Sequence, residues 1–418
     1  MQETSSRAEF ADALRKGKGR AMAHIRAHGD AGVEDLLLDA CLHSLSYDSQ
    51  SEGWRGDWMM EMLSLLPDPG PYHRAVVEAF RESTEFNDVG QMGQMLRVMA
   101  ADGDAAARTA LYEKFAQPRF QDPWVLAMGI IALDGVDGAL HVGRVLGGRL
   151  LADPEYQVDG GVGAQVREAG AEQAVLDAAA NDAALQRFAD EVLSGEVVVR
   201  KRARPIVSLP QFLAEIDEGK KHTVGSAYRF GRSAGETELR QLLALCAVES
   251  DPARLAAMLM VFRRTKVPGG SASLLRYARF PDGAVRAAAI SGLERFKDDA
   301  VAALAEEMLA VGSLEGVGLL EKNTVPGQFA RVLALLPAEP DERTAHELGL
   351  AILRIDRAGR TADMAGWLLW VYEQTPCSFC RNGSVSDLLE LGLLPPELCS
   401  ECRDDCNFET RELVASSD

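Results

Sequence analysis

Apolar positions between residues 280 and 309 recur with the period of an α-helix, in two consecutive runs. The first apolar face consists of Val285, Ala288, Ala289, Leu293 and Phe296. The second apolar face consists of Val301, Leu304, Ala305, Met308 and Leu309. This pattern predicts a hairpin of two helices with apolar inner faces. Such a unit cannot bury both faces by itself, so it is stable only when it stacks on similar units.

Acidic residues and prolines mark the expected helix starts. Asp282 precedes the first apolar run as an N-cap, and Asp298 and Asp299 precede the second, where negative charge favours the helix dipole. Asp251-Pro252 combines a cap with proline at the first helical position. Short helical patterns alternate with turns along the rest of the chain, without strand patterns between them. The sequence therefore predicts an all-α fold.

The order of residues in this segment resembles the HEAT repeat. Pro281-Asp282 is followed by Val285-Arg286, a run of alanines and then Leu293, and residues 249–262 and 102–115 carry weaker copies. The resemblance implies a right-handed, armadillo-like α-solenoid of stacked helical hairpins, and such solenoids usually serve as interaction scaffolds. The C-terminal sequence beginning at Thr375 also resembles the closing repeat of uncharacterised bacterial HEAT-repeat proteins.

Composition breaks suggest four segments. They are N-terminal helical repeats over residues 1–195, a basic linker over 196–208, HEAT-like repeats over 209–372 and a cysteine-rich terminal hairpin over 373–418. The linker carries the chain's one dense basic run: Arg200, Lys201, Arg202 and Arg204. This run has two interpretations, a solvated linker or a docking strip for an anionic partner.

Charge limits the classes of partner. The chain of 418 residues has a formal net charge of -19, which repels nucleic-acid backbones and anionic membranes. The N-terminus has no apolar signal region, and no uninterrupted apolar stretch reaches the length of a spanning helix, about 18 residues. We therefore expect a cytoplasmic protein that binds a protein partner rather than nucleic acid or a membrane.

The C-terminal cysteines are the clearest candidate for metal chemistry. Cys377 and Cys380 form one CxxC pair, Cys399 and Cys402 form a second, and Cys406 follows. The spacing matches a four-cysteine zinc site. We expect helices over residues 377–391 and 395–405. If they pack antiparallel, the ligands would be Cys377, Cys380, Cys402 and either Cys399 or Cys406.

Three interpretations of these cysteines stay open at this point. They are ligands of a structural zinc ion, plain core thiols on the inner face of a hairpin, or a redox pair. The resemblance to a closing HEAT repeat implies no metal. Cys41 and Cys246 stand alone in helical patterns and are expected to be buried small hydrophobes.

Sequence signatures of catalysis are absent. The chain contains no GxSxG, HExxH or GxxxxGK[ST] motif. The glycine-rich run 160–163 has neither a preceding strand pattern nor a following Lys-Ser or Lys-Thr pair. We therefore expect a non-catalytic scaffold that binds a protein on its concave face. The alternative is a HEAT-like enzyme or enzyme accessory, similar to bilin lyases or alkyl-base DNA glycosylases.

Overall fold

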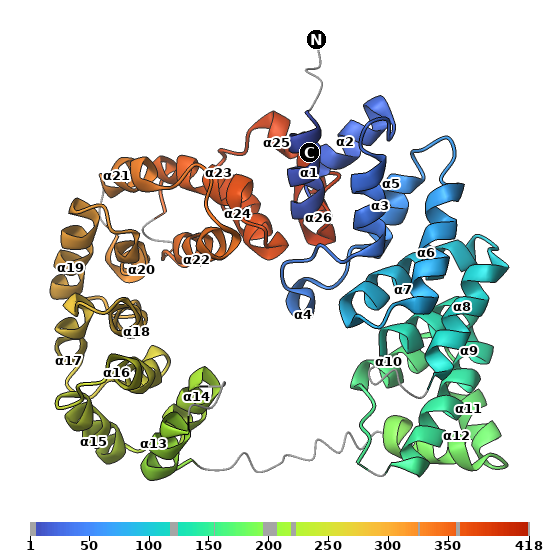
Figure 1. Cartoon of the computed structure of the whole chain (residues 1–418), viewed down its shortest axis with the longest axis horizontal. Coiled ribbons are helices and arrows are strands. Elements are labelled where there is room, and N and C mark those ends of the chain that lie inside the picture. Colours follow the sequence, from blue (N-terminus) through green and yellow to red (C-terminus); the bar gives the residue numbers. More distant parts are fainter. Residues whose placement is uncertain are drawn as a thin grey trace. The chain divides into compact units, whose positions relative to one another are not determined.

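The computed structural model describes residues 6–117, 124–153, 155–194, 207–218, 223–324, 327–356 and 360–416. These residues contain helices and turns and no strand, which confirms the all-α prediction. The chain divides into two compact units, drawn in Figure 1. Unit 1 comprises residues 1–201 together with 396–418, and unit 2 comprises residues 202–395. The basic run Arg200, Lys201, Arg202 and Arg204 lies outside the described residues.

Unit 1 contains helices from both ends of the chain. Its N-terminal part consists of α1 (Arg7–Lys16), α2 (Gly19–His28), α3 (Glu34–Leu42), α4 (Ser49–Glu52), α5 (Gly56–Leu63), α6 (Gly70–Glu82), α7 (Phe86–Ala101), α8 (Ala105–Ala116), α9 (Trp124–Ala152), α10 (Gly160–Glu168), α11 (Glu172–Ala179), α12 (Ala183–Phe188) and the π-helical turn Ala189–Leu193. Its C-terminal part consists of α25 (Pro396–Cys402) and α26 (Phe408–Ala415). The glycine-rich run 160–163 forms the first turn of α10, capped by Asp159.

The apolar helix α9 belongs to the core of unit 1. By length and composition alone it could cross a membrane, and it is the one described helix of which this is true. However, Gly135 breaks it with a non-helical backbone at φ 56° and ψ −121°. The two halves contact α7, α8, α10, α11 and α12, and their inward side chains are buried. Burial of these inward side chains contributes to the apolar character of α9.

Unit 2 arranges its helices in two layers (Figure 1). One layer contains α14 (Thr223–Ser233), α16 (Pro252–Leu259), α18 (Gly283–Leu293), α20 (Leu320–Asn323), α22 (Glu342–Leu353) and α24 (Ser378–Glu390). The other contains α15 (Glu236–Cys246), α17 (Ala272–Leu275), α19 (Asp299–Ala310), α21 (Gln328–Leu335) and α23 (Ala365–Gln374). Helix α13 (Leu209–Asp217) packs on α14 and α16, and 3₁₀ turns form at Met260–Arg263, Tyr277–Arg279, Leu314–Val317 and Ala362–Met364.

The hairpin expected at residues 280–309 is present as α18 and α19. Asp282 caps α18 by accepting hydrogen bonds from the amides of Ala284 and Val285, at 2.9 and 3.1 Å. Asp298 caps α19 in the same way, through the amide of Ala300. The predicted apolar face is buried in both helices. One detail of the prediction is wrong: α18 ends at Leu293, so Phe296 lies beyond the helix.

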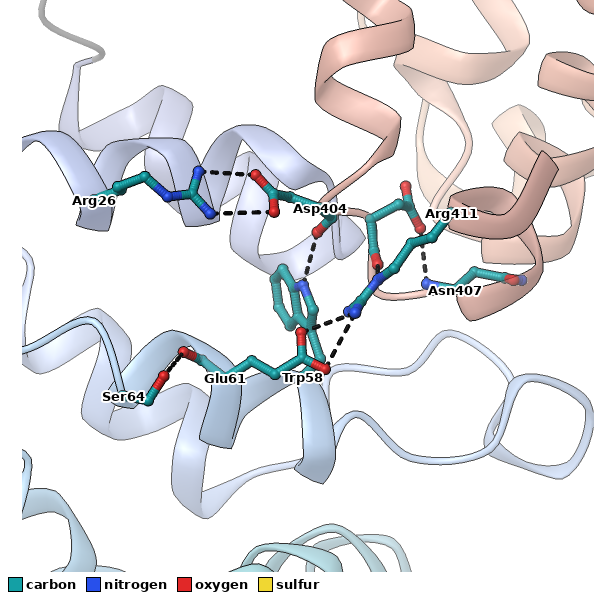
Figure 2. A network of polar contacts seen from close by, with 8 residues as sticks. Arg26, Trp58, Glu61, Ser64, Asp404, Asn407 and Arg411 are labelled. Carbon is teal, nitrogen blue, oxygen red and sulfur yellow. Dashed lines mark hydrogen bonds and ion pairs between the residues drawn. The ribbon is translucent and has the colours of Figure 1, made fainter. Parts of the chain in front are cut away.

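The C-terminal segment packs against the N-terminal helices within unit 1 (Figure 2). The carboxylate of Asp404 pairs with Arg26 at 2.9 Å, and the backbone carbonyl of Asp404 accepts a hydrogen bond of 3.0 Å from the indole of Trp58. Arg411 pairs with Glu61 at 2.8 Å. Exposed ion pairs stabilise a fold by at most about 1 kcal/mol each, so the buried Trp58 contributes most to this contact.

Candidate metal centre

Cys377 and Cys380 lie at the N-terminus of α24. Cys377 is the N-cap residue, with extended backbone at φ −77° and ψ 122°, and Cys380 lies within the first turn of the helix. Both residues are buried, with exposed fractions of 5% and 2%. The CxxC spacing therefore places two thiols beside one helix terminus, where the free backbone amides favour negative charge.

His346 on the neighbouring helix α22 completes a group of three potential metal ligands. Its Nδ1 atom lies 3.6 Å from the Sγ atom of Cys380. The ligand atoms of His346, Cys377 and Cys380 all lie within 4.8 Å of one another. The CxxC spacing predicted the two cysteines as ligands, whereas no ligand motif had pointed to the histidine.

Packing and polar contacts hold α22 beside α24. At the end of α22 opposite His346, Arg360 donates hydrogen bonds to the carbonyl oxygens of Leu353 and Ile355, at 2.8 and 3.0 Å. The same guanidinium pairs with the buried carboxylate of Asp387 on α24. Close to the thiols, Gly349 lets Thr375 approach, because a Cβ atom at Gly349 would lie 2.7 Å from the Cγ2 atom of Thr375.

The distance between the imidazole of His346 and the thiol of Cys380 fits a tetrahedral zinc site. Zinc binds thiolate at about 2.3 Å and imidazole at about 2.0 Å, so sulfur and nitrogen ligands on adjacent vertices lie about 3.5 Å apart. The distance between His346 Nδ1 and Cys380 Sγ is 3.6 Å. Two thiolates also neutralise the charge of a divalent cation, which a buried site requires. A fourth coordination position would remain for water or for a ligand outside this group.

The other three candidate cysteines belong to unit 1. Cys402 is buried at the end of α25, while Cys399 and Cys406 are half-buried. The backbone amide of Cys406 donates to the carbonyl oxygen of Gly17, and α25 contacts α2. Cys377 and Cys380 thus meet His346 in unit 2, whereas Cys399, Cys402 and Cys406 are assigned to the other unit. The four-cysteine ligand set stays a prediction.

The two isolated cysteines behave as expected of core residues. Cys41 in α3 and Cys246 in α15 are both buried. Burial raises the pKa of each thiol to about 12. Neither thiol therefore ionises at neutral pH, which suits packing rather than metal binding or redox chemistry.

A signal for His346 was present in the sequence as a repeat spacing. His346 precedes Cys380 by 34 positions, about the length of one repeat of paired helices. In a stack of such repeats, residues separated by one repeat lie on neighbouring helices of the same layer. A search for ligands one repeat upstream of the CxxC pair would have included this histidine.

Comparison with known proteins adds no assignment. No protein-family model, no curated protein and no solved structure matches this chain. The resemblance to HEAT repeats therefore stays a prediction.

Proposed function

We propose that this protein binds a zinc ion through His346, Cys377 and Cys380. The observation that carries the proposal is the mutual approach of three soft ligand atoms to within 4.8 Å, on two adjacent helices of unit 2. The ion would link α22 to the N-terminus of α24. It would join two helices of one layer near the C-terminal end of unit 2, and it would keep one coordination position that these three residues do not fill.

Metal analysis of the purified full-length protein tests this proposal. Mass spectrometry is expected to find about one zinc ion per chain. After exchange with Co²⁺, thiolate-to-metal charge transfer should appear in the near ultraviolet, with visible bands typical of a tetrahedral site. His346→Ala and Cys380→Ser should remove both signals. Cys246→Ala is the matched control, since it removes a buried cysteine of the same unit outside the group.

Two outcomes would contradict this ligand set. Wild-type protein without stoichiometric zinc would rule out a resident metal, and a Cys377–Cys380 disulfide in that protein would favour the redox interpretation instead. Zinc retained in His346→Ala but lost in Cys402→Ser would favour the four-cysteine set. Circular dichroism of each variant establishes that lost binding does not reflect unfolding.

The metal centre would form part of a scaffold. We propose that unit 2 is a right-handed, HEAT-like α-solenoid whose layer containing α14 to α24 presents a concave face to a protein partner in the cytoplasm. The alternation of its helices between two layers supports this arrangement.

Cross-linking in cells tests the scaffold proposal. Lys322 lies on α20 of this layer, and Lys297 lies in the connection from α18 to α19, so a lysine-reactive cross-linker reports on this layer and on its edge. A specific partner should cross-link to these lysines, and the links should disappear when Lys297 and Lys322 are replaced by arginine. Cross-links confined to other surfaces, or recovery of nucleic acid in place of protein, would contradict the proposal. Fractionation of the same cells reports the cytoplasmic location.

A further inference from the structure

Unit 2 contains a pocket at the junction of α14 and the 3₁₀ turn that follows α16. Its volume is about 290 Å³, close to the lower end of the range for small-molecule sites. The lining residues are Gly225, Tyr228, Met260, Val261, Arg263, Arg264 and Thr265. The pocket therefore combines an aromatic ring, an apolar surface, two guanidinium groups and a hydroxyl group.

The two arginines of this pocket carry positive charge without forming an ion pair among the described residues. Several other arginines of unit 2 pair with carboxylates, as Arg254 does with Asp217, Arg279 with Glu307 and Arg286 with Glu315. By contrast, neither Arg263 nor Arg264 has an ion pair or hydrogen bond with any residue that the structure describes. Adjacent unpaired arginines are unexpected in a chain with a net charge of -19.

Glu294 interacts electrostatically with Arg263 but does not fully neutralise its charge. Arg263 acts on Glu294, but burial raises the pKa of Glu294 to about 7 despite that influence and that of Arg354. Glu294 is therefore only partly ionised at neutral pH, and positive charge remains at the pocket.

Tyr228 forms an exposed aromatic wall beside these charges. Its exposed fraction is 40%, so part of the ring is open to solvent. The guanidinium of Arg264 lies 5.8 Å from the ring centroid and that of Arg232 lies 5.7 Å from it. Arg232 also donates to the Tyr228 hydroxyl at 3.4 Å. The ring is thus held in place by cation–π contacts, with surface left for a ligand to pack against.

We propose that this pocket binds a phosphate monoester attached to an aromatic body. Arginine guanidinium groups donate paired hydrogen bonds that match phosphate oxygens, and Thr265 supplies a hydroxyl donor. The aromatic body would pack on Tyr228 and on the apolar side chains of Met260 and Val261. The proposal concerns a site separate from His346, Cys377 and Cys380, so zinc binding and phosphate-ester binding can fail independently.

Calorimetric titration of the full chain tests the proposal with four probes: adenosine monophosphate, phenyl phosphate, adenosine and inorganic phosphate. Both phosphate esters should bind saturably with one site per chain. Adenosine and inorganic phosphate should each bind at least tenfold more weakly, because each lacks one half of the recognised chemistry. Tighter binding of adenosine monophosphate than of phenyl phosphate would identify a nucleotide as the source of the ester, and the reverse order would identify a phosphorylated phenol.

Variants separate this pocket from general charge effects. Arg263→Gln with Arg264→Gln should weaken ester binding at least tenfold, and Tyr228→Leu should weaken it several-fold. Arg240→Gln is the matched control, because Arg240 is an exposed arginine of α15 that does not line the pocket. Equal weakening in Arg240→Gln, absence of saturable binding, or inorganic phosphate binding as tightly as the esters would overturn the proposal.

Discussion

The backbone amide of Cys406 donates a hydrogen bond of 2.9 Å to the carbonyl oxygen of Gly17, although the two residues lie near opposite ends of the chain. Gly17 connects α1 to α2 and has a left-handed backbone with φ 73°. A Cβ atom at this position would lie 2.2 Å from the Sγ atom of Cys406. The contact therefore depends on glycine both for its backbone and for its missing side chain.

Replacement of Gly17 tests how much this contact stabilises unit 1. Gly17→Ala introduces both backbone strain and a steric clash with Cys406. Gly170→Ala is the control, because Gly170 also has a positive φ of 65° but has no atom within 4 Å of the added Cβ. We expect Gly17→Ala to lower the free energy of unfolding by about 1–3 kcal/mol more than Gly170→Ala, the usual range for overpacking. Equal losses in urea unfolding would show that the contact with Cys406 contributes little.

Zinc should stabilise the folded protein against heat. A ligand that binds only the native state at a concentration 100 times its Kd raises the free energy of unfolding by about 2.7 kcal/mol. Differential scanning calorimetry should show a higher Tm with excess zinc and a lower Tm after chelation. The shift should vanish in His346→Ala and persist in Cys246→Ala. A shift that persists in His346→Ala would place the stabilising ion elsewhere.

Gly349 is expected to position the thiols without contacting the metal. In Gly349→Ala the new Cβ would press on Thr375, two residues ahead of Cys377, and displace the start of α24. We expect weaker zinc binding by roughly tenfold, the lower end of the range for groups that orient metal ligands, and altered visible bands of the Co²⁺ form. Gly283→Ala provides the control, since its Cβ meets only the end of the Arg286 side chain, at 3.6 Å. Unchanged affinity in Gly349→Ala would show that the segment adapts.

Removal of a buried hydroxyl group should have opposite effects on the free energy of unfolding at Thr375 and at Ser384. The Oγ1 atom of Thr375 is buried and has no hydrogen-bond partner among the described residues, whereas Ser384 donates to the carbonyl oxygen of Leu368 at 2.5 Å. Thr375→Val should therefore raise the free energy of unfolding by about 1 kcal/mol, and Ser384→Ala should lower it by a similar amount. A loss in both variants, measured by urea unfolding, would imply a bound water at Thr375.

Ionisation of Glu294 should lower the free energy of unfolding of unit 2 as the pH rises. Burial raises the pKa of this carboxyl to about 7, so the folded state holds its proton more tightly than the unfolded chain does. The resulting stabilisation is complete below the unfolded pKa of about 4.5 and is lost as the pH rises through about 7. Glu294→Gln should remove this dependence on pH. The free energy of unfolding of the variant, relative to that of wild type, should therefore be roughly 1–3 kcal/mol higher at pH 8 than at pH 5.

Glu307 is the control for this pH dependence. Its hydrogen bond with Arg279 lowers the pKa of Glu307, so the stabilisation by this carboxylate is present above its unfolded pKa and lost in acid. Glu307→Gln should therefore not gain stability at pH 8. Parallel pH profiles for the two variants in urea unfolding would contradict the proposed cause.

The residues that the sequence located correctly depend on local rules. Asp282 and Asp298 cap helices because their carboxylates reach amides two or three residues away. The buried faces of α18 and α19 follow from helical period alone. Phe296 shows the limit of such rules, because the period continued in the sequence after the helix had ended at Leu293.

The candidate metal ligands show the same difference between what local sequence patterns reveal and what they miss. The CxxC pair of Cys377 and Cys380 was visible because both ligands lie in one helical turn, whereas His346 belongs to another helix and was missed. The second pair, Cys399 and Cys402, has the spacing of a ligand pair but is assigned to unit 1. The spacing of cysteines in the sequence does not determine which of them share a site, because the ligand set depends on how distant helices pack.

The amino-acid sequence by itself determined that this chain is helical, where many of its helices begin, and which faces they bury. These properties arise from interactions between residues within about one helical turn, and those interactions can be recognised from spacing and residue type. Only the tertiary structure decided that His346 approaches Cys380, that Arg263 and Arg264 line a pocket with Tyr228, and that Cys406 packs against Gly17. Each of these contacts joins helices separated in the chain, and their relative placement results from side-chain packing over the whole unit.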